Sequence, residues 1–241
     1  MELYLIRHGQ SANNLREQAL AAHGGALPAV TAPRMADPPL TDLGKQQARL
    51  AGESLRDEGI TTLYCGPMLR TLQTARIIGE LLDLSPHVFV GLHEWGGVWE
   101  PRSDENSVQL PGLTRNEMSA TFPGYVLPAD VTDRGWWFHD WAGDRAMLEL
   151  AHRNALSFIA HLEEDHGDAD HRIAAILHSG SGSSLVSALF GIPLHTKWQE
   201  RFVHDNAGIS RISITPDHRQ LRYLNRIDHL SNTDARSKPP R

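Results

Sequence analysis

An arginine and a histidine stand together at the end of the first apolar run of the chain. Leu3 to Ile6 is a short hydrophobic stretch that predicts a buried strand, and Arg7 and His8 follow it directly. In an open α/β sheet, ligands bind beyond the carboxyl ends of the strands. A neutral imidazole at such a place can attack phosphorus, and a guanidinium can hold phosphate oxygens through paired hydrogen bonds. The pair therefore points to phosphoryl transfer, but a lone Arg-His-Gly tripeptide is weak evidence.

Similar residues follow three other predicted strands. His178 ends the apolar strand at 172–178, and the helix that opens at Ser179 would turn free N–H groups toward an anion. Arg70 opens the helix after the second strand, and Glu94 follows the third. Because the predicted topology brings these strand ends to one edge, we expect two histidines, two arginines and one glutamate to form a single site.

The elements that must position these residues begin in a β–α–β–α–β order, which predicts a parallel sheet covered by helices. Thr41 is a candidate N-cap, and the segment after it places its apolar residues along one helical face. Segment 15–40 is expected to be a long loop with room for one helical turn. The expected strands are 3–6, 61–65, 87–91, 172–178, 209–215 and 220–225, and the expected helices are 42–58, 69–83, 143–165 and 179–190.

The predicted fold class is α/β: a three-layer α/β/α sandwich with a mostly parallel sheet and a long lid insertion after the third strand. We expect one domain over 1–241, an insertion at 95–142 and a disordered polar tail at 231–241. Five of the six tryptophans fall in or beside the insertion, and they could stack on an organic group of a substrate or form the lid's own small core. They are Trp95, Trp99, Trp136, Trp137 and Trp141.

Composition narrows the possible partners. The chain has 241 residues, a formal net charge of -6 and one cysteine, Cys65, which excludes an internal disulfide framework and any multi-cysteine zinc site. The net charge argues against nucleic acid and anionic membranes as partners. No apolar run is long enough for a membrane span, and the first residues lack a signal-peptide pattern, so the expected compartment is the cytoplasm. The histidine-rich segment 161–171 matches no zinc signature and is interpreted as a solvated polar turn.

Five segments, in chain order, resemble the motifs of the histidine phosphatase superfamily, in the branch that holds cofactor-dependent phosphoglycerate mutases and many small phosphatases. They cover most of the chain, and three are long enough to be specific. The first is Arg-His-Gly-Gln-Ser-Ala-Asn-Asn at 7–14, and the others lie at 37–48, 65–75, 92–94 and 177–180.

The resemblance implies a role for each matching residue. His8 would be the nucleophile that forms a phosphohistidine, and Glu94 would be the proton donor. The phosphate would be bound by Arg7, Asn14, Arg70 and His178. No metal and no cofactor is implied, because side chains supply the cations. The stretch after Glu94 departs from the phosphatase pattern by one residue and by Pro101 in place of a glycine, so Glu100 and Glu105 are alternative acids.

Three functions stay open on the sequence. A metal-independent phosphatase acting on a small-molecule phosphomonoester is the preferred hypothesis, with a substrate alcohol larger than phosphoglycerate as a weaker suggestion. Phosphoglycerate mutase-type transfer is an alternative, although the mutase pattern after the acid is absent and the insertion offers its cations in another arrangement, at Arg102, Arg115, Arg134 and Arg145. A phospho-ligand-binding module without catalysis is the third, and it has no need for a nucleophile and an acid together.

Overall fold

A six-stranded mixed sheet forms the centre of the protein. The computed structural model describes residues 1–25, 33–101, 107–139, 143–166, 170–193 and 202–231. The strands lie in the order β3-β2-β6-β1-β7-β8; the first four are parallel to one another, β7 pairs antiparallel with β1, and β8 pairs antiparallel with β7. Their bounds are β1 Glu2–Arg7, β2 Thr62–Cys65, β3 His87–Val88, β6 Arg172–Leu177, β7 Ile209–Ile214 and β8 Arg219–Arg226. The predicted mostly parallel sheet is confirmed.

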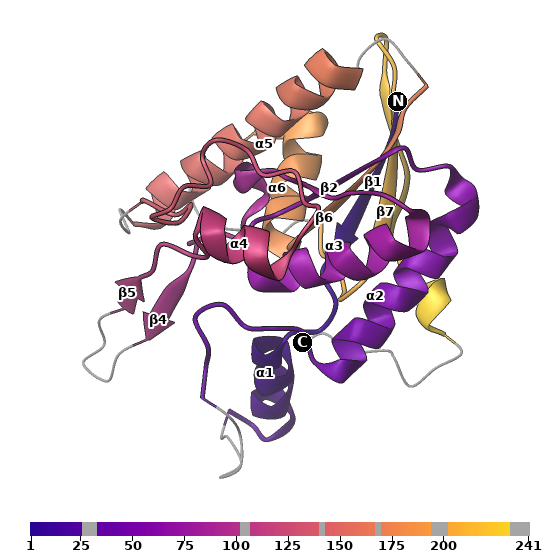
Figure 1. Cartoon of the computed structure of the whole chain (residues 1–241). Helices are drawn as coiled ribbons and strands as arrows, with labels where there is room; N and C mark the ends of the chain where they lie inside the picture. The colour runs from indigo at the N-terminus through magenta and orange to yellow at the C-terminus, as the bar shows by residue number, and fades with distance from the viewer. Residues whose placement is uncertain (26–32, 102–106, 140–142, 167–169, 194–201, 232–241) are drawn as a thin grey trace.

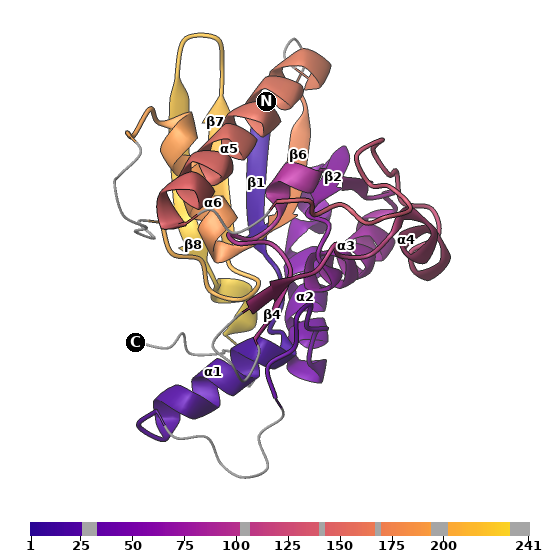
Figure 2. The same cartoon turned by 90° about the vertical axis from the view of Figure 1, so that its left-hand side faces the viewer.

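Helices cover both faces of this sheet, as Figure 2 shows. One pair packs on one face and a second pair on the other; in chain order they are α2 (Asp42–Leu55), α3 (Leu69–Leu82), α5 (Asp144–His166) and α6 (Ser179–Leu189). Successive side chains of a strand point to opposite faces. Tyr4 and Ile6 therefore join the core under α2 and α3, and Leu3 and Leu5 join the core under α5 and α6. These two cores make the three-layer α/β/α architecture that the sequence predicts.

The segment expected to be a loop at 15–40 begins as a helix, so that prediction was wrong for its first part. Helix α1 spans Ala12–Ala22, and its N-cap Ser11 accepts from the backbone N–H of Asn14 while the Asn14 side chain accepts from the backbone of Ser11. This reciprocal cap satisfies two of the donors that a helix start leaves open. Asn13 is the buried residue of α1. Its one buried residue is polar, so no core-facing apolar residue marks this helix in the sequence.

The region between β3 and α5 holds regular elements that the sequence pattern did not indicate. Strands β4 (Trp99–Pro101) and β5 (Ser107–Gln109) pair antiparallel, and α4 spans Arg115–Thr121. β3 is shorter than predicted and leads into a 3-10 turn at Val90–Leu92; similar turns occur at Arg56–Glu58 and Asp228–Leu230. Both α1 and the β4–β5 ribbon lie beyond the sheet edge at which β1 ends (Figure 1).

Two tryptophans of the insertion are core residues. Trp136 and Trp137 are buried and pack with the core that lies under α2 and α3. Trp141 and the tail after Ser231 lie outside the described residues. None of the helices that the structure describes has both the length and the apolar composition needed to cross a membrane.

Histidines gather around one tyrosine hydroxyl on the α5 side of the sheet. His161 Nε2 and His166 Nε2 lie 3.0 Å and 3.1 Å from the Tyr64 hydroxyl oxygen. The segment interpreted as a solvated turn therefore packs in part against β2. Among the described residues, no group of side chains here or elsewhere has the arrangement of a metal site. We call this group the Tyr64 cluster; its members are Tyr64, His87, His161, Asp165, His166 and His171.

The Tyr64 cluster should make stability depend on pH. Burial lowers the pKa values of His87 and His166, the neighbouring histidines lower them further, and Asp165 acts in the opposite direction. The unfolded chain thus takes up these protons first, so stability is complete above the ordinary value of 6.5 and falls as pH drops below it. We expect the double variant His87→Gln, His166→Gln to lose less of its free energy of unfolding than the wild type between about pH 7.5 and about pH 5.5.

Urea unfolding at the two pH values measures this difference. His152→Gln, in α5 outside the cluster, is the control and should keep the wild-type pH dependence. An unchanged loss of stability in the double variant would show that these two histidines do not contribute to it.

Candidate active site

The ends of β1 and β6 bring two histidines together. Arg7 is in register with Leu177, and the backbone N–H of His8 donates to the Leu177 carbonyl at 3.0 Å. His178 follows β6 directly, and its ring centroid lies 5.0 Å from that of His8. Both side chains are buried. The strand-end argument from the sequence therefore places these two residues correctly side by side.

The hydrogen bonds of His8 define its tautomer. Nδ1 lies 2.7 Å from the Gly9 carbonyl oxygen, which can only accept, so Nδ1 carries the proton. Nε2 accepts from Nε–H of Arg70 at 3.2 Å, so it holds a lone pair. Burial, and then the charges of Arg70 and Arg7, keep the pKa of His8 well below its ordinary value. His8 is consequently a neutral imidazole with its nucleophilic nitrogen facing a cation.

Close backbone packing holds the residue after His8 in place. A side chain on Gly9 would overlap the Gly44 carbonyl, and one on Gly44 would overlap the Gln10 carbonyl. Thr41, the N-cap of α2, donates to the Gln10 side chain at 2.7 Å and accepts from the Gly44 N–H at 3.0 Å. The start of α2 is thus pressed against the turn that carries His8, which explains why glycine stands at both positions.

Arg70 is positioned by an aspartate that the sequence did not single out. Both carboxylate oxygens of Asp37 accept from the Leu69 N–H, at 3.1 and 3.0 Å, and Oδ1 lies 3.6 Å from Nη1 of Arg70. Burial raises the pKa of Asp37, and the charge of Arg70 and the N–H of Leu69 oppose that rise. Asp37 therefore caps α3 and braces the guanidinium that faces His8.

Glu94 is held by backbone N–H groups. Its Oε1 accepts from the Trp95 N–H at 2.9 Å and its Oε2 from the Gly180 N–H at 3.3 Å. The start of α6, expected to face an anion, thus binds the carboxylate of Glu94. Burial raises the pKa of Glu94 above its ordinary value, and these N–H groups, Arg70 and Arg7 oppose that rise without cancelling it.

The alternative acids have no comparable place. Glu100 is an exposed residue of β4 and does not line the cavity that Glu94 lines. Glu105 lies outside the described residues.

A loop before β7, which carries no recognisable motif, supports the remaining polar residues. Nη1 of Arg7 donates to the His204 carbonyl at 2.6 Å. Asn206 Nδ2 donates both to the His8 carbonyl and to Oδ1 of Asn14, each at 3.1 Å. With its oxygen engaged in this way, Asn14 presents its amide N–H groups as possible donors. Sequence reasoning missed His204 and Asn206 because their role depends on contacts almost 200 positions away along the chain.

These side chains surround a small polar cavity of about 200 Å³, below the usual range for drug-sized ligands. Five of the six predicted site residues line it, and His178 lies buried behind His8. The lining is Arg7, His8, Ser11, Asn13, Asn14, Glu17, Arg34, Ala36, Pro38, Arg70, Glu94, Trp95, Gly97 and Trp99.

Comparison with known proteins identifies the family of the chain. The model of the histidine phosphatase superfamily, branch 1, matches residues 3–227. The chain belongs to this superfamily. The probable phosphoglycerate mutases GpmB of Yersinia enterocolitica and Salmonella paratyphi A are 26% and 28% identical, and each alignment covers 88% of this chain and 84% of the relative.

Solved structures of phosphatases share the fold. The α-ribazole phosphatase of Shigella flexneri is 25% identical, with a TM-score of 0.59 over 94% of this chain and 96% of that one. A mycobacterial glucosyl-3-phosphoglycerate phosphatase, solved with VO3, is 22% identical, with a TM-score of 0.58 over 93% and 98% of the two chains. The second likeness supports the fold alone.

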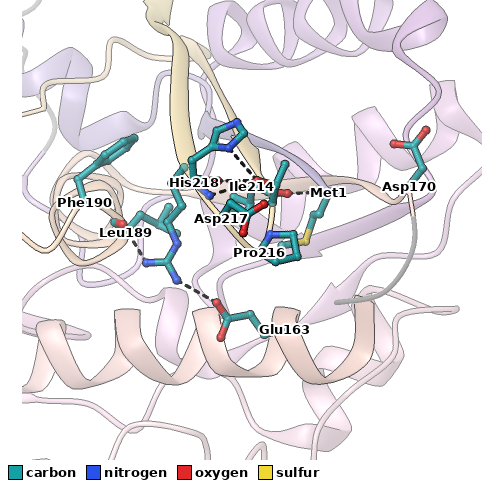
Figure 3. Close-up of a pocket in the computed structure, with 11 residues that line it drawn as sticks. Met1, Glu163, Asp170, Leu189, Phe190, Ile214, Pro216, Asp217 and His218 are labelled. Carbon is teal, nitrogen blue, oxygen red and sulfur yellow. Dashed lines mark hydrogen bonds and ion pairs between the residues drawn. The ribbon is translucent and has the colours of Figure 1, made fainter.

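A larger cavity of about 880 Å³ lies at the other end of the sheet, beside Met1 and Ile214 (Figure 3). Its arginine, Arg219, donates to Glu163 and to the Leu189 carbonyl, both at 2.9 Å, so that its charge is already neutralised. None of the predicted site residues lines it. We therefore place the candidate active site of this superfamily member in the smaller cavity.

Loss of the charge of Asp37 should weaken anion binding in the small cavity. Asp37→Asn keeps an oxygen for the Leu69 N–H but removes the ionic partner of Arg70. We expect inorganic phosphate to bind about threefold to tenfold more weakly, as measured by calorimetry, because Arg70 is held less firmly. Asp133→Asn, a change at an exposed position, should bind phosphate as the wild type does. Equal affinity in the two variants would refute the bracing role of Asp37.

Proposed function

We propose that this protein is a metal-independent phosphatase that hydrolyses a small phosphomonoester through a phosphohistidine on His8. The observation that carries the proposal is the orientation of His8. Its Nε2 accepts a hydrogen bond from Arg70 at 3.2 Å, while its Nδ1–H donates to the Gly9 carbonyl. Attack on phosphorus requires a nitrogen without a proton, and Arg70, which donates to that nitrogen here, would donate instead to the oxygens of a bound phosphate.

Phosphate binding would use the donors around that nitrogen. Arg7 and Arg70 supply positive charge, and Asn14 supplies an amide. His178 is buried, and neither of its ring nitrogens has a hydrogen-bond partner among the described residues. Burial and the nearby charge of Arg70 lower its pKa well below the ordinary value, so it would donate a single N–H as a neutral ring. Such donors, fixed in advance, stabilise the charge that spreads over the phosphoryl oxygens in the transition state.

The reaction would proceed in two displacements. Nε2 of His8 attacks phosphorus, the P–N bond forms as the ester P–O bond breaks, and the leaving oxygen takes the proton of Glu94. Water then attacks the phosphohistidine and gives its proton to Glu94, and the P–N bond breaks to release phosphate. The raised pKa of Glu94 supports the first role, because the carboxyl must be protonated when the substrate binds.

Phosphoglycerate mutase-type transfer is the second candidate, because curated relatives carry that name. Two of the cations that the sequence offered for a second anionic group are engaged elsewhere. Arg115 donates to three backbone carbonyls, those of Leu127, Pro128 and Val131. Arg145 forms an ion pair with Glu149 at 2.6 Å. Arg134 is exposed and does not line the cavity, and Arg102 lies outside the described residues. A binding module without catalysis would not require a neutral histidine and an acid in one cavity.

His8 should become phosphorylated during turnover. Rapid quenching of the enzyme with p-nitrophenyl phosphate should trap a phosphoryl group that is stable in base and labile in acid. His8→Ala should lose the adduct and at least about 99% of the activity, because the nucleophile is absent. In the wild type, the phosphoryl adduct and the activity should both persist in EDTA, since side chains supply the cations.

His218→Ala, an exposed histidine far from the cavity, is the matched control. Normal turnover by His8→Ala would disprove the nucleophile, and loss of all activity in EDTA with rescue by a divalent ion would disprove metal independence. A parallel assay of 3-phosphoglycerate isomerisation separates hydrolysis from transfer.

The rate should also report two displaced pKa values. His8 has its pKa lowered below 6.5, so the neutral nucleophile persists into acid, and activity falls only when pH drops through that lowered value. Glu94 has its pKa raised above 4.5 and acts protonated, so activity falls as pH rises through that raised value. We expect a bell-shaped profile of kcat/KM for alkyl phosphates.

Glu94→Gln tests the assignment of the high-pH side. This variant should lose most activity on alkyl phosphates but much less on p-nitrophenyl phosphate, whose leaving group needs little protonation. It should also lose the high-pH fall. Glu100→Gln is the control and should behave as the wild type; the reverse pattern would assign the acid to Glu100.

A further inference from the structure

Arg34 lines the same cavity as His8 but belongs to neither the predicted nucleophile nor the predicted phosphate site. Its guanidinium carbon lies 3.5 Å from the centroid of the Trp99 ring, and its Nη1 donates to the Trp99 carbonyl at 3.0 Å. A guanidinium stacked on an indole is held flat, so its other N–H groups keep a fixed direction. Trp99, on β4, thereby fixes the side chain of Arg34.

The backbone beside Arg34 is fixed as well. Asn13, which is buried in α1, donates from Nδ2 to the Met35 carbonyl at 2.8 Å and accepts at Oδ1 from the Met35 N–H at 3.0 Å. Both polar groups of Met35 are thus bound to one side chain. Arg34 is preorganised from two sides, which removes much of the entropy that an arginine loses when it binds a ligand.

The charge of Arg34 has no close partner in the part of the chain that the structure describes. Among the described residues, no carboxylate lies within ion-pair distance of it, and the contacts described for the remaining N–H groups include no acceptor. Glu17 of α1 attracts it from farther away, whereas Arg70 and Arg16 repel it. A half-buried guanidinium without an ion-pair partner is available to an anionic ligand.

We propose that Arg34, stacked on Trp99, binds a second oxyanion, carried by the alcohol part of the substrate. The inference rests on the proposed function, because the first oxyanion is the ester phosphate at His8. The second would be a carboxylate or a second phosphate, since a planar array of N–H donors matches both. The cavity of about 200 Å³ favours a small alcohol. The face of the Trp99 ring that is stacked on Arg34 is not available to an aromatic group of the substrate.

Three esters of similar size test this subsite. Phosphoglycolate carries a carboxylate, ethylene glycol bisphosphate carries a second phosphate, and phosphoglycolamide is the neutral isostere of the first. We expect the wild type to prefer one charged ester over the amide by about tenfold to a hundredfold in kcat/KM, as for a hydrogen bond to a charged group. The preferred ester identifies which oxyanion Arg34 binds.

Substitution of Arg34 should remove the preference. In Arg34→Gln the ratio of kcat/KM for the charged ester over the amide should fall to about one, and Arg34→Lys should recover part of it. Trp99→Leu should lower the ratio to a smaller extent, because the guanidinium loses its support. Arg49→Gln, an exposed change on α2, is the matched control and should keep both the wild-type ratio and the wild-type rate.

The two proposals fail in different ways. Turnover of p-nitrophenyl phosphate with no preference for either charged ester, or a preference that survives in Arg34→Gln, overturns the subsite and leaves the phosphatase proposal standing. If no ester is hydrolysed, calorimetry measures the preference for a charged ester over the amide as a ratio of their dissociation constants. A preference for a charged ester that is lost in Arg34→Gln then supports the subsite without catalysis, and equal binding of all three esters overturns it.

Discussion

A neutral histidine among guanidinium groups is the constraint on which the whole site depends. His8 can act as a nucleophile only while Nε2 keeps its lone pair, and burial, with the charges of Arg70 and Arg7, lowers its pKa and preserves that state. The same arginines are needed to hold a phosphate. One arrangement therefore serves binding and activation, and it requires that no unprotonated acid comes close enough to His8 to stabilise its charged form.

Glu94 meets this constraint because its carboxyl is tied to the backbone. Gly180 at the start of α6 and the N–H of Trp95 each bind one oxygen, so Glu94 can alternate between charged and neutral forms without reaching for the arginines. Burial favours the neutral form and the N–H groups favour the charged one. The two effects oppose each other, and burial is the larger of them. A group that must both give and take a proton needs such a balance.

Much of this arrangement could be predicted from the order of strands. Leu3 to Ile6 and the run before His178 are apolar enough to be recognised as buried strands, and parallel pairing then places His8 and His178 at one edge. Helix α1 could not be found in this way, because it follows no buried strand pattern and its one buried residue, Asn13, is polar. Its reciprocal cap, Ser11 with Asn14, was the available signal.

Contacts between distant segments were beyond sequence reasoning for a different reason. Asn206 reaches His8, and Arg34 reaches Trp99, from positions with no motif of their own. Such pairs depend on how loops cross outside the sheet, which neither periodicity nor spacing records. The tryptophans of the insertion illustrate the point, because the sequence does not separate those with different roles. Trp136 and Trp137 are buried in the core, whereas Trp95 and Trp99 line the cavity.

The division of the tryptophans bears on what the cavity can accept. Trp136 and Trp137 are buried, so these two rings are not available to bind a large alcohol, and the sequence-based suggestion of a bulky substrate loses part of its support. One face of the Trp99 ring is instead stacked on the guanidinium of Arg34. On this side, the cavity therefore presents the charge of Arg34 rather than an apolar surface. In a cavity of about 200 Å³, that leaves selectivity to charge and hydrogen bonding, which discriminate more sharply between small alcohols than apolar contact does.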